Sequence, residues 1–365
     1  MQYIESPSEF INKSHADILR DAAFEAELRK NLHDTQLVLI YQQNLFNMYV
    51  PKEYGGLELS LPEILRKEEG LSWADGSTSW VVTLCSGAAW FVGFLDPAMV
   101  QEVAESDRVC FAGSGAVTGT ATKISDGFEI NGYWKYATGS LHATLFTVNC
   151  HIKDDGVQLY NADGSPVVLT FLLKRNEVIV HNTWNGMGMV ATGSHAFQIR
   201  QVRVRLNRSF IIDAAHATLE HVIFKYPFLQ LAETTLAVNL SGMACRFLDL
   251  CSALLSSKVK NNPHTPDLLQ LLTDSEARLN DARISFYSHS DAAWDVLLSE
   301  SRIPESMLAE VSNASYKLAH CSREMVNELY PYCGLAAADT RNEINRVWRN
   351  IHTAGQHSLF NIRNF

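Results

Sequence analysis

The sequence lacks clusters of lysine and arginine, and it lacks a segment typical of a secretory signal. Only 19% of its 365 residues are charged, and its formal net charge is −10 at pH 7. Because neutralising phosphates requires clustered cations, we expect no nucleic-acid partner. The first ten residues, MQYIESPSEF, contain no basic stretch followed by an apolar one. This pattern predicts a protein that stays in the cytoplasm.

Cysteine pairs and uninterrupted apolar runs are also absent. The seven cysteines form no CxxC pair and no Cys/His spacing of a zinc site, which predicts reduced, mostly buried thiols and no metal centre. The most apolar stretch, residues 79–95, is interrupted by Thr83, Ser86, Gly87 and Gly93. A buried core helix is therefore favoured over a membrane span, and we expect no membrane partner.

The residue pattern changes twice along the chain. Residues 1–107 show helical patterns that begin at the N-cap serines Ser6 and Ser60. Residues 108–215 are rich in β-branched and aromatic runs, which predicts an antiparallel β-domain of six to eight strands. In residues 216–365 apolar side chains recur at helical spacing, which predicts a bundle of three or four long antiparallel helices. We expect an α+β protein of three domains with these bounds.

Two glycine-rich segments are the first candidates for a site. They are residues 50–56, VPKEYGG, and residues 111–121, FAGSGAVTGTA. In the second, glycines let backbone groups approach a flat heterocycle, and the Ser114 hydroxyl can bond its pyrimidine edge. A glycine-rich hairpin that binds no ligand is the structural alternative for the same residues. With the order of helices, sheet and bundle, both segments resemble the acyl-CoA dehydrogenases and their relatives, the two-component flavin monooxygenases. The resemblance implies flavin contacts from Phe111 and Ser114.

Residues 132–143, GYWKYATGSLHA, resemble the monooxygenase pattern W-x-(F/Y)-(A/S)-S-G-x-x-H-A, with Thr138 in place of serine. The resemblance places Thr138 and Gly139 on the flavin and makes Thr138 and His142 candidate catalytic residues. A hydroxyl donor near flavin N5 can slow the loss of peroxide from an oxygen adduct. The structural alternative for Thr138 is a strand-end threonine that bonds the backbone.

Residues 183–195, TWNGMGMVATGSH, resemble the family pattern W-x-x-x-G-x-R-G-T-G-S. In the family this turn and its tryptophan line the flavin. The resemblance therefore implies four further flavin contacts: Trp184, Thr192, Gly193 and Ser194. Val190 stands where relatives often carry arginine, so no phosphate contact is transferred to this position.

Residues 346–357, RVWRNIHTAGQH, resemble the monooxygenase pattern R-x-W-R-D-(I/L)-H-x-x-x-x-H, with Asn350 in place of aspartate. The resemblance implies a flavin contact from Arg349 and a catalytic and substrate-binding role for His357. A histidine with an ordinary pKa near 6.5 suits proton transfer at neutral pH, although a buried histidine at the end of a bundle is the structural alternative.

Many acyl-CoA dehydrogenases place a carboxylate base in this C-terminal stretch. Here no aspartate or glutamate occurs in residues 344–365, and Asp249 is an acidic candidate on another helix. The FAD pyrophosphate motif R-x-x-F-G of the dehydrogenases is also missing, because residues 256–263 read SSKVKNNP. The cofactor predicted from the resemblance is therefore FMN or FAD, supplied in the reduced form.

Three functions remain open. The first is a monooxygenase that receives reduced flavin from a separate reductase, forms a C4a-hydroperoxyflavin and oxygenates a small organic substrate. The second is an FAD-dependent acyl-CoA dehydrogenase with a relocated base, and the third is a catalytically silent flavin-binding homologue. The resemblance also implies a homotetramer. For the substrate pocket the candidates besides His357 are Trp90 and Phe91.

Overall fold

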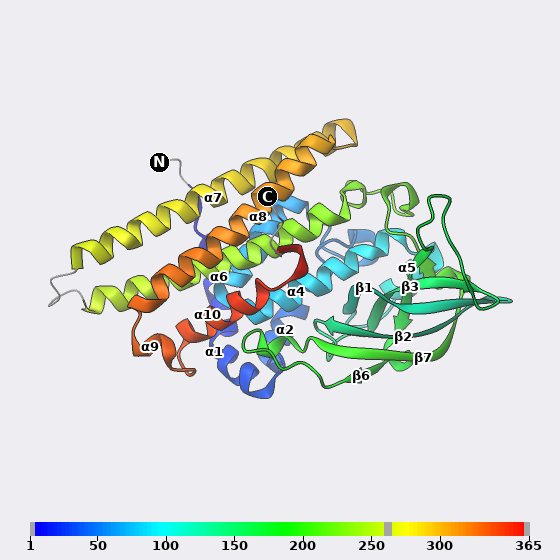
Figure 1. The fold of residues 1–365 in the computed structure, drawn as a ribbon, viewed down its shortest axis with the longest axis horizontal. Helices are drawn as coiled ribbons and strands as arrows, with labels where there is room; N and C mark the ends of the chain where they lie inside the picture. The colour runs from blue at the N-terminus through cyan, green and yellow to red at the C-terminus, as the bar shows by residue number, and fades with distance from the viewer. Residues whose placement is uncertain (1–3, 259–264, 361–365) are drawn as a thin grey trace.

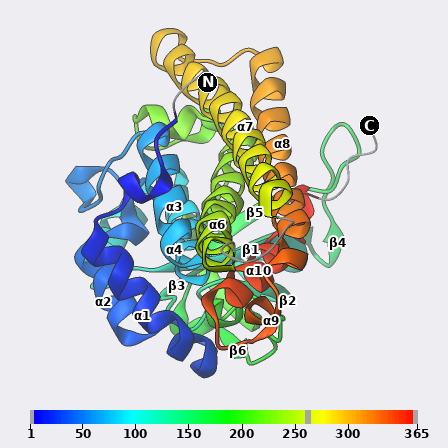
Figure 2. The ribbon, with the colours of Figure 1, turned by 90° about the vertical axis from the view of Figure 1, so that its left-hand side faces the viewer.

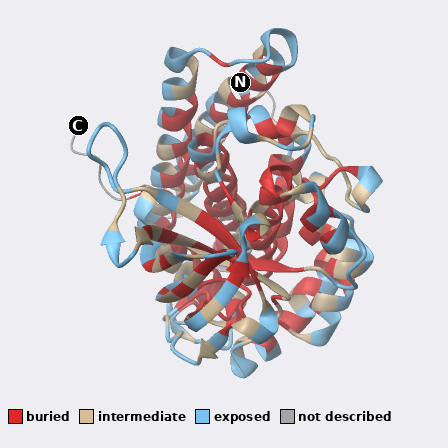
Figure 3. Cartoon of the chain, turned by 90° about the vertical axis from the view of Figure 1, so that its right-hand side faces the viewer, coloured by how far each residue is buried: buried red, intermediate tan, exposed pale blue. Residues whose placement is uncertain are grey.

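Helices from both ends of the chain enclose one end of an eight-stranded sheet in the computed structural model, while the other end of the sheet projects away from them (Figure 1). The structure describes residues 4–258 and 265–360. Viewed along the long helices, the N-terminal helices lie beside the central helix of the bundle (Figure 2). Buried residues gather where the sheet meets the helices, and exposed residues lie at the hairpin tips (Figure 3).

Helices make up the first and last parts of the described chain. Their bounds are α1 (Lys13–Arg29), α2 (Asp34–Gln42), α3 (Leu61–Ala74), α4 (Gly76–Ala89), α5 (Pro97–Ala104), α6 (Phe228–Lys258), α7 (Thr265–Glu300), α8 (Glu305–Leu329), α9 (Leu335–Ala338) and α10 (Glu343–Ala354). The strands are β1 (Phe111–Ile124), β2 (Gly127–Ala137), β3 (Leu145–Asp154), β4 (Val157–Gln158), β5 (Val168–Lys174), β6 (Ile179–His181), β7 (His195–Arg205) and β8 (Ser209–Phe210).

The change from helix to strand lies between Ala104 and Phe111, and the change back lies between Phe210 and Phe228. The predicted α+β fold is thus confirmed. The division into three domains at residues 107 and 215 stays a prediction.

The predicted serine caps are present. Ser60 begins α3, with its N–H donating to Glu63 Oε2 at 2.8 Å and its hydroxyl accepting from the Glu63 N–H at 3.4 Å. Ser6 makes the same reciprocal box with Glu9, but it begins a 3₁₀ turn instead of an α-helix. Both caps satisfy N–H groups that the first turn leaves without an internal partner.

The sheet is mixed, so the prediction of an antiparallel β-domain is wrong for one strand pair. The strand order is β6-β7-β2-β1-β3-β5-β8, with β4 pairing β3 outside this path. β1 and β3 run parallel, with Phe111 opposite Leu145, whereas the other pairs are antiparallel. The reason is that β7 occupies the outer edge of β2, so the chain crosses to the free edge of β1 and runs beside it in the same direction. The predicted number of strands is confirmed.

The apolar stretch at residues 79–95 forms most of α4 and the 3₁₀ turn Trp90–Phe94, as predicted for a buried core helix. By length and composition alone, Gly76–Phe94 and Phe228–Leu255 could each cross a membrane, but 83% and 61% of their most apolar windows are buried within the structure. A helix that is apolar on all sides is typical of a protein core. α4 packs between the sheet and α6 and therefore reaches both.

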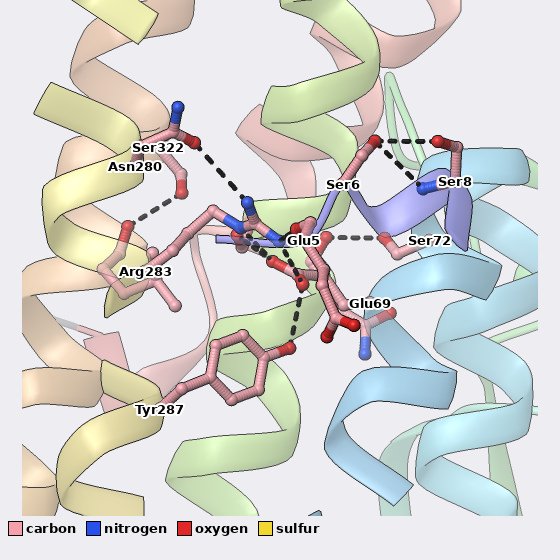
Figure 4. A network of polar contacts seen from close by, with 12 residues as sticks. Glu5, Ser6, Ser8, Glu69, Ser72, Asn280, Arg283, Tyr287 and Ser322 are labelled. Atoms are coloured by element: carbon pink, nitrogen blue, oxygen red, sulfur yellow. Dashed lines mark hydrogen bonds and ion pairs between the residues drawn. The ribbon is translucent and has the colours of Figure 1, made fainter. Parts of the chain in front are cut away.

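A buried ion pair joins the N-terminal helices to the bundle (Figure 4). The Arg283 guanidinium donates to both Glu69 oxygens, at 2.8 and 2.9 Å, and also to the Glu5 carbonyl at 2.8 Å. The Tyr287 and Ser241 hydroxyls donate to the same carboxylate at 2.8 and 2.5 Å. Glu69 and Arg283 are 0% and 1% exposed, so solvent does not screen the pair.

Replacing Arg283 with alanine should lower the free energy of unfolding by about 3–5 kcal/mol, because it leaves the Glu69 carboxylate buried without its cation. Urea denaturation measures the change. A suitable control is Arg278→Ala, because Arg278 pairs with Glu328 at the surface and such pairs contribute about 1 kcal/mol or less. Equal losses in the two variants would show that the buried pair does not hold these helices together.

Candidate functional site

Three of the predicted hydroxyl residues meet where β2 ends and β7 begins. Ala137 pairs with His195 across these strands, which brings Thr138 next to Ser194. The Thr138 and Ser194 hydroxyl oxygens are 2.9 Å apart, and the Ser194 and Thr192 hydroxyl oxygens are 2.7 Å apart. All three side chains are at most 6% exposed. We call Thr138, Ser194 and Thr192 the hydroxyl chain.

The direction of the protons in the hydroxyl chain follows from its last bond. Thr192 donates its only hydroxyl proton to the Met189 carbonyl at 2.8 Å. Ser194 must then donate to Thr192, and Thr138 must donate to Ser194, since each hydroxyl carries one proton. The Thr138 oxygen therefore offers lone pairs, and no proton, to any ligand beside it, so the prediction of a hydroxyl donor is wrong because Ser194 takes that proton.

Gly139 allows α4 to pack directly against the hydroxyl chain. Its φ is +73°, and a Cβ there would lie 2.5 Å from Cys85 Sγ on α4. The Gly139 N–H donates to the Thr192 carbonyl at 3.0 Å, which links the two turns. Gly193, in the second turn, also has a positive φ, of +55°. Glycine is needed at Gly139 for both conformation and space.

Tyr136, which was not among the predicted site residues, lies beside the predicted flavin residue Trp184 and these turns. Tyr136 is 70% exposed and has a φ of +65°, which is strained for a residue with a side chain. Its ring lies 6.3 Å from the Trp184 ring at an interplanar angle of 84°, and Trp184 is held by a 2.8 Å bond from its indole N–H to the Met189 carbonyl. A register shift between Trp134 and Ala137 turns Tyr136 outward, and strand alternation gives no signal of such a shift.

The two predicted flavin residues of β1 differ in position. Phe111 is 1% exposed and packs in the core, and its predicted flavin contact stays a prediction. Ser114 is partly exposed, and its hydroxyl accepts one long bond, from the Ala116 N–H at 3.5 Å. A Cβ built on the neighbouring Gly115 would meet nothing within 4 Å. The structure thus leaves open space at Gly115, while Ser114 offers a partly exposed hydroxyl.

Arg349 is bound by protein groups. Its guanidinium donates to the two Glu27 oxygens at 2.5 and 2.9 Å, to the Asn345 side chain at 2.7 Å and to the Met187 carbonyl at 2.8 Å. The next residue, Asn350, accepts from the Met189 N–H at 2.6 Å. Arg349 and Asn350 of α10 therefore position the loop that carries Trp184 in this structure. The predicted flavin contact of Arg349 stays a prediction.

The two candidate catalytic histidines lie apart in the fold. The His357 ring makes an edge contact with Trp80 on α4, with ring centres 6.1 Å apart, and burial lowers its pKa. His142 follows the Gly139 turn, and its Nε2 is buried without a hydrogen-bond partner. Burial lowers the pKa of His142 to about 4, which the nearby Asp34 only partly offsets. Both imidazoles are therefore neutral at pH 7.

Trp90 and Phe91, the predicted substrate contacts, lie in a buried aromatic cluster. They are 1% and 8% exposed, and the Trp90 indole N–H donates to the Ile223 carbonyl at 3.0 Å. The Trp90 ring stacks on Phe228 with centres 5.7 Å apart. Their role in substrate binding stays a prediction. Asp249, the alternative base, is bound through its carboxylate to the Trp73 indole N–H at 2.7 Å instead of to a predicted site residue.

Two surface cavities lie away from the hydroxyl chain. One of about 300 Å³ lies between α5 and the strands β3 and β5, and one of about 390 Å³ lies beside α2. None of the predicted site residues lines either cavity. Among residues 4–258 and 265–360, no group of three His, Cys, Asp or Glu side chains is placed to hold a metal ion.

Comparison with known proteins agrees with this geometry. Residues 234–362 match the family described as acyl-CoA dehydrogenase, C-terminal domain. The chain is 26% identical to an indole-3-acetate monooxygenase of Pseudomonas putida, over 94% of this chain and 88% of that one. It is 23% identical to the oxygenase subunit HsaA of a flavin-dependent monooxygenase of Mycobacterium tuberculosis, over 93% and 88%.

Solved structures give the same result for the fold. XiaF from Streptomyces sp., in complex with FADH2 and glycerol, superimposes with a TM-score of 0.85 at 24% identity, over 97% of this chain and 91% of that one. The HsaA monooxygenase of M. tuberculosis gives a TM-score of 0.87 at 21% identity, over 98% and 94%. Residues 234–362 thus resemble the C-terminal domain of the acyl-CoA dehydrogenases, and the chain shares the fold of these solved monooxygenases. The relatives include a monooxygenase and the oxygenase subunit of a flavin-dependent monooxygenase, so the resemblance predicted from the sequence is confirmed.

The low pKa of His142 predicts a loss of stability in acid. Between about pH 6.5 and about pH 4 the unfolded chain binds a proton at this residue and the folded chain does not. The stability that this residue supports is complete above pH 6.5 and is lost as the pH falls through this window. Replacing His142 with glutamine should reduce the pH-dependent loss by up to about 3 kcal/mol. Urea unfolding from pH 7 to pH 4 measures this, with the exposed His216→Gln as control, and identical slopes in wild type and His142→Gln would contradict it.

Proposed function

We propose that this protein is the oxygenase component of a two-component flavin monooxygenase, which uses reduced flavin from a separate reductase to oxygenate a small organic substrate. The names of its relatives support this, because they include an oxygenase subunit and the oxygenase component of an FADH(2)-dependent resorcinol hydroxylase of Rhizobium, which is 22% identical. The complex of XiaF with FADH2 supports a reduced flavin. The observation that carries the proposal is the direction of the hydroxyl chain.

The residues present fit the ring system of a flavin. The exposed ring of Tyr136 and the half-buried ring of Trp184 offer aromatic surface, and Ser114 offers a partly exposed hydroxyl. Thr138 lies two residues after Tyr136 and offers an acceptor to the same site. The segment predicted to lack a pyrophosphate anchor lies largely outside the described residues, so FMN and FAD both remain compatible with the proposal.

The acceptor character of Thr138 suits the reduced cofactor. A reduced flavin carries a proton on N5, whereas an oxidised flavin has a lone pair there. The Thr138 oxygen can accept from that N–H and thus hold the proton in place, while it would face a lone pair of oxidised flavin with lone pairs of its own. A bound reduced flavin supplies the activation of oxygen, and Thr138, Ser194 and Thr192 supply a fixed acceptor.

His357 is proposed to exchange a proton with the substrate or with the activated oxygen. Its contact with Trp80 holds the ring at the face of α4, and its lowered pKa keeps it neutral at pH 7 and able to accept a proton. The carboxylate base of many dehydrogenases is absent from residues 344–365, which favours oxygenation over the removal of an α-proton. His142 is the second proposed catalytic residue, because its unpartnered Nε2 follows the Gly139 turn directly.

We also infer a cytoplasmic homotetramer, consistent with the exposed apolar side chains Phe228 and Leu229 at the start of α6. Sedimentation velocity of the purified protein tests the oligomeric state, and a monomer would exclude the tetramer.

The function is tested by mixing the protein with reduced FMN or reduced FAD without oxygen and then adding oxygen. We expect a transient absorbance that differs from those of both reduced and oxidised flavin. A panel of phenols and indoles should then yield a product that contains one atom from labelled oxygen gas. Immediate flavin oxidation without a transient, together with reduction of bound FAD by an acyl-CoA, would favour the dehydrogenase alternative. Failure to bind either flavin would exclude both enzymes.

Replacing Thr138 with valine should weaken the binding of reduced flavin by about 10-fold and abolish any preference for reduced over oxidised flavin, because the N5 proton loses its acceptor. Anaerobic fluorescence titration measures both dissociation constants. Thr118→Val is a matched control, because the Thr118 hydroxyl donates to the Tyr133 carbonyl at 2.8 Å on an exposed face. An unchanged preference in Thr138→Val would exclude this role.

Replacing His357 with glutamine should slow product formation by on the order of 100-fold and leave the dissociation constant for reduced flavin unchanged, because proton transfer is lost while the shape is nearly kept. The wild-type rate should fall as the pH drops, since the neutral imidazole is the active form and the low pKa of His357 places this fall on the acid side. A pH–rate profile of both proteins measures this. Equal rates at neutral pH would remove His357 from the mechanism.

A further inference from the structure

Four fully buried side chains around α3 and α4 carry polar atoms without a hydrogen-bond partner. They are Tyr49, Glu68, Tyr226 and Asn239, each at most 1% exposed. The atoms concerned are both Glu68 carboxyl oxygens, the two phenolic oxygens and the Asn239 side-chain oxygen. Buried polar groups in folded proteins nearly always have a partner, so a cluster of this kind indicates that something else fills the role.

The members of this cluster are neighbours. The Glu68 carboxyl and the Tyr226 phenol both help to raise the pKa of Tyr49, although burial is the larger cause. Thr83 on α4 accepts from the Asn239 amide at 2.8 Å, and its hydroxyl is also close enough to Glu68 to affect its pKa. We call Tyr49, Glu68, Tyr226 and Asn239 the buried oxygen cluster, with Thr83 at its edge.

The charge state of the cluster restricts its ligand. Burial raises the pKa of Glu68 well above its ordinary value, and the Thr83 hydroxyl opposes this only weakly. Burial likewise raises the pKa of Tyr226. An uncharged cluster suits an uncharged ligand, because an ion would have to be stripped of water without gaining an opposite charge.

The atoms of the cluster restrict the ligand further. Every unpartnered atom in the cluster is an oxygen, and all of these oxygens can accept a hydrogen bond. A carboxyl group and two phenols can also donate, whereas the Asn239 oxygen can only accept. Because the Asn239 oxygen can only accept, a group that donates, such as N–H or O–H, is one partner that the cluster needs.

The cluster adjoins the proposed active site. Thr83 follows Trp80 by three residues and precedes Gly87 by four, so the three share one face of α4. Trp80 contacts the His357 ring, and a Cβ on Gly87 would meet nothing within 4 Å. This face of α4 thus runs from His357, past the edge of the cluster, to open space.

We propose that the buried oxygen cluster is the polar end of the substrate site and binds an uncharged N–H or O–H group of an aromatic substrate. The proposal rests on the proposed function, since it places the ring of that substrate near His357. Glu68, Tyr49, Tyr226 and Asn239 are specificity-determining residues that select substrates with such a donor.

The test compares probes that have the donor with probes in which a methyl group replaces its proton. Indole is paired with 1-methylindole, and phenol with anisole, and binding to the full-length protein is measured by isothermal titration calorimetry. We expect the wild type to bind each donor about 10-fold more tightly than its methylated partner. Tyr226→Phe, Tyr49→Phe and Glu68→Gln should each bring this ratio close to one.

Tyr41→Phe is the matched control, because the Tyr41 hydroxyl makes one long bond, of 3.4 Å, to the Arg108 carbonyl and lies outside the cluster. Its ratio should equal that of the wild type. Circular dichroism identifies any variant that does not fold, and the two tyrosine variants keep the test valid if Glu68→Gln is one of them.

Equal binding of donor and methylated probes by the wild type, or binding of neither, would overturn the proposal. So would unchanged ratios in all three variants, which would mean that the cluster holds ordered water only. The measurement needs no flavin, so its outcome is independent of the oxygen experiment. If the protein prefers the donor probes but does not activate oxygen, the ligand role of the buried oxygen cluster would be supported and the proposed function would be contradicted.

Discussion

The buried ion pair between Glu69 and Arg283 sets the helix packing on which the site depends. It joins α3 to α7, and the Ser241 hydroxyl adds α6 to the same carboxylate. Glu68, the preceding residue of α3, belongs to the buried oxygen cluster. Glu69 therefore joins α3 to its neighbouring helices, whereas Glu68 presents an unpartnered carboxyl group. The Arg283 guanidinium pairs with the Glu69 carboxylate within the buried core. Glu68 has no such cation, and burial raises its pKa and keeps it uncharged.

α4 connects this helical core to the sheet. On one side, the Cys85 thiol lies 3.7 Å from the Thr138 carbonyl, close to the hydroxyl chain. On another side, Thr83 binds Asn239 of α6 at 2.8 Å. A shift of α4 would therefore disturb the hydroxyl chain and the buried oxygen cluster together. This coupling explains why α4 is apolar on nearly all sides and deeply buried.

The sequence predicted the features that depend on neighbouring residues. Helical periodicity and serine caps are local, and so is the motif that brings Thr138 to the end of a strand. Long-range features escaped prediction. The parallel pairing of β1 and β3 depends on which strand edge is free, the Arg349 contact depends on Glu27 in α1, and the outward turn of Tyr136 depends on a bulge against β7. Glu68 read as an ordinary helix residue, because only the fold reveals that it has no partner.

The end of the sheet that projects from the helices lies far from the hydroxyl chain. β2 runs from Gly127 at that end to Ala137 beside the hydroxyl chain, a span of roughly 30 Å for a strand of this length. The loop at residues 161–164 is exposed and follows β4, which pairs with the last residues of β3. Exposed loop tips tolerate added sequence. This loop is therefore a natural attachment point for an affinity handle or a fluorescent reporter, at a distance from the hydroxyl chain.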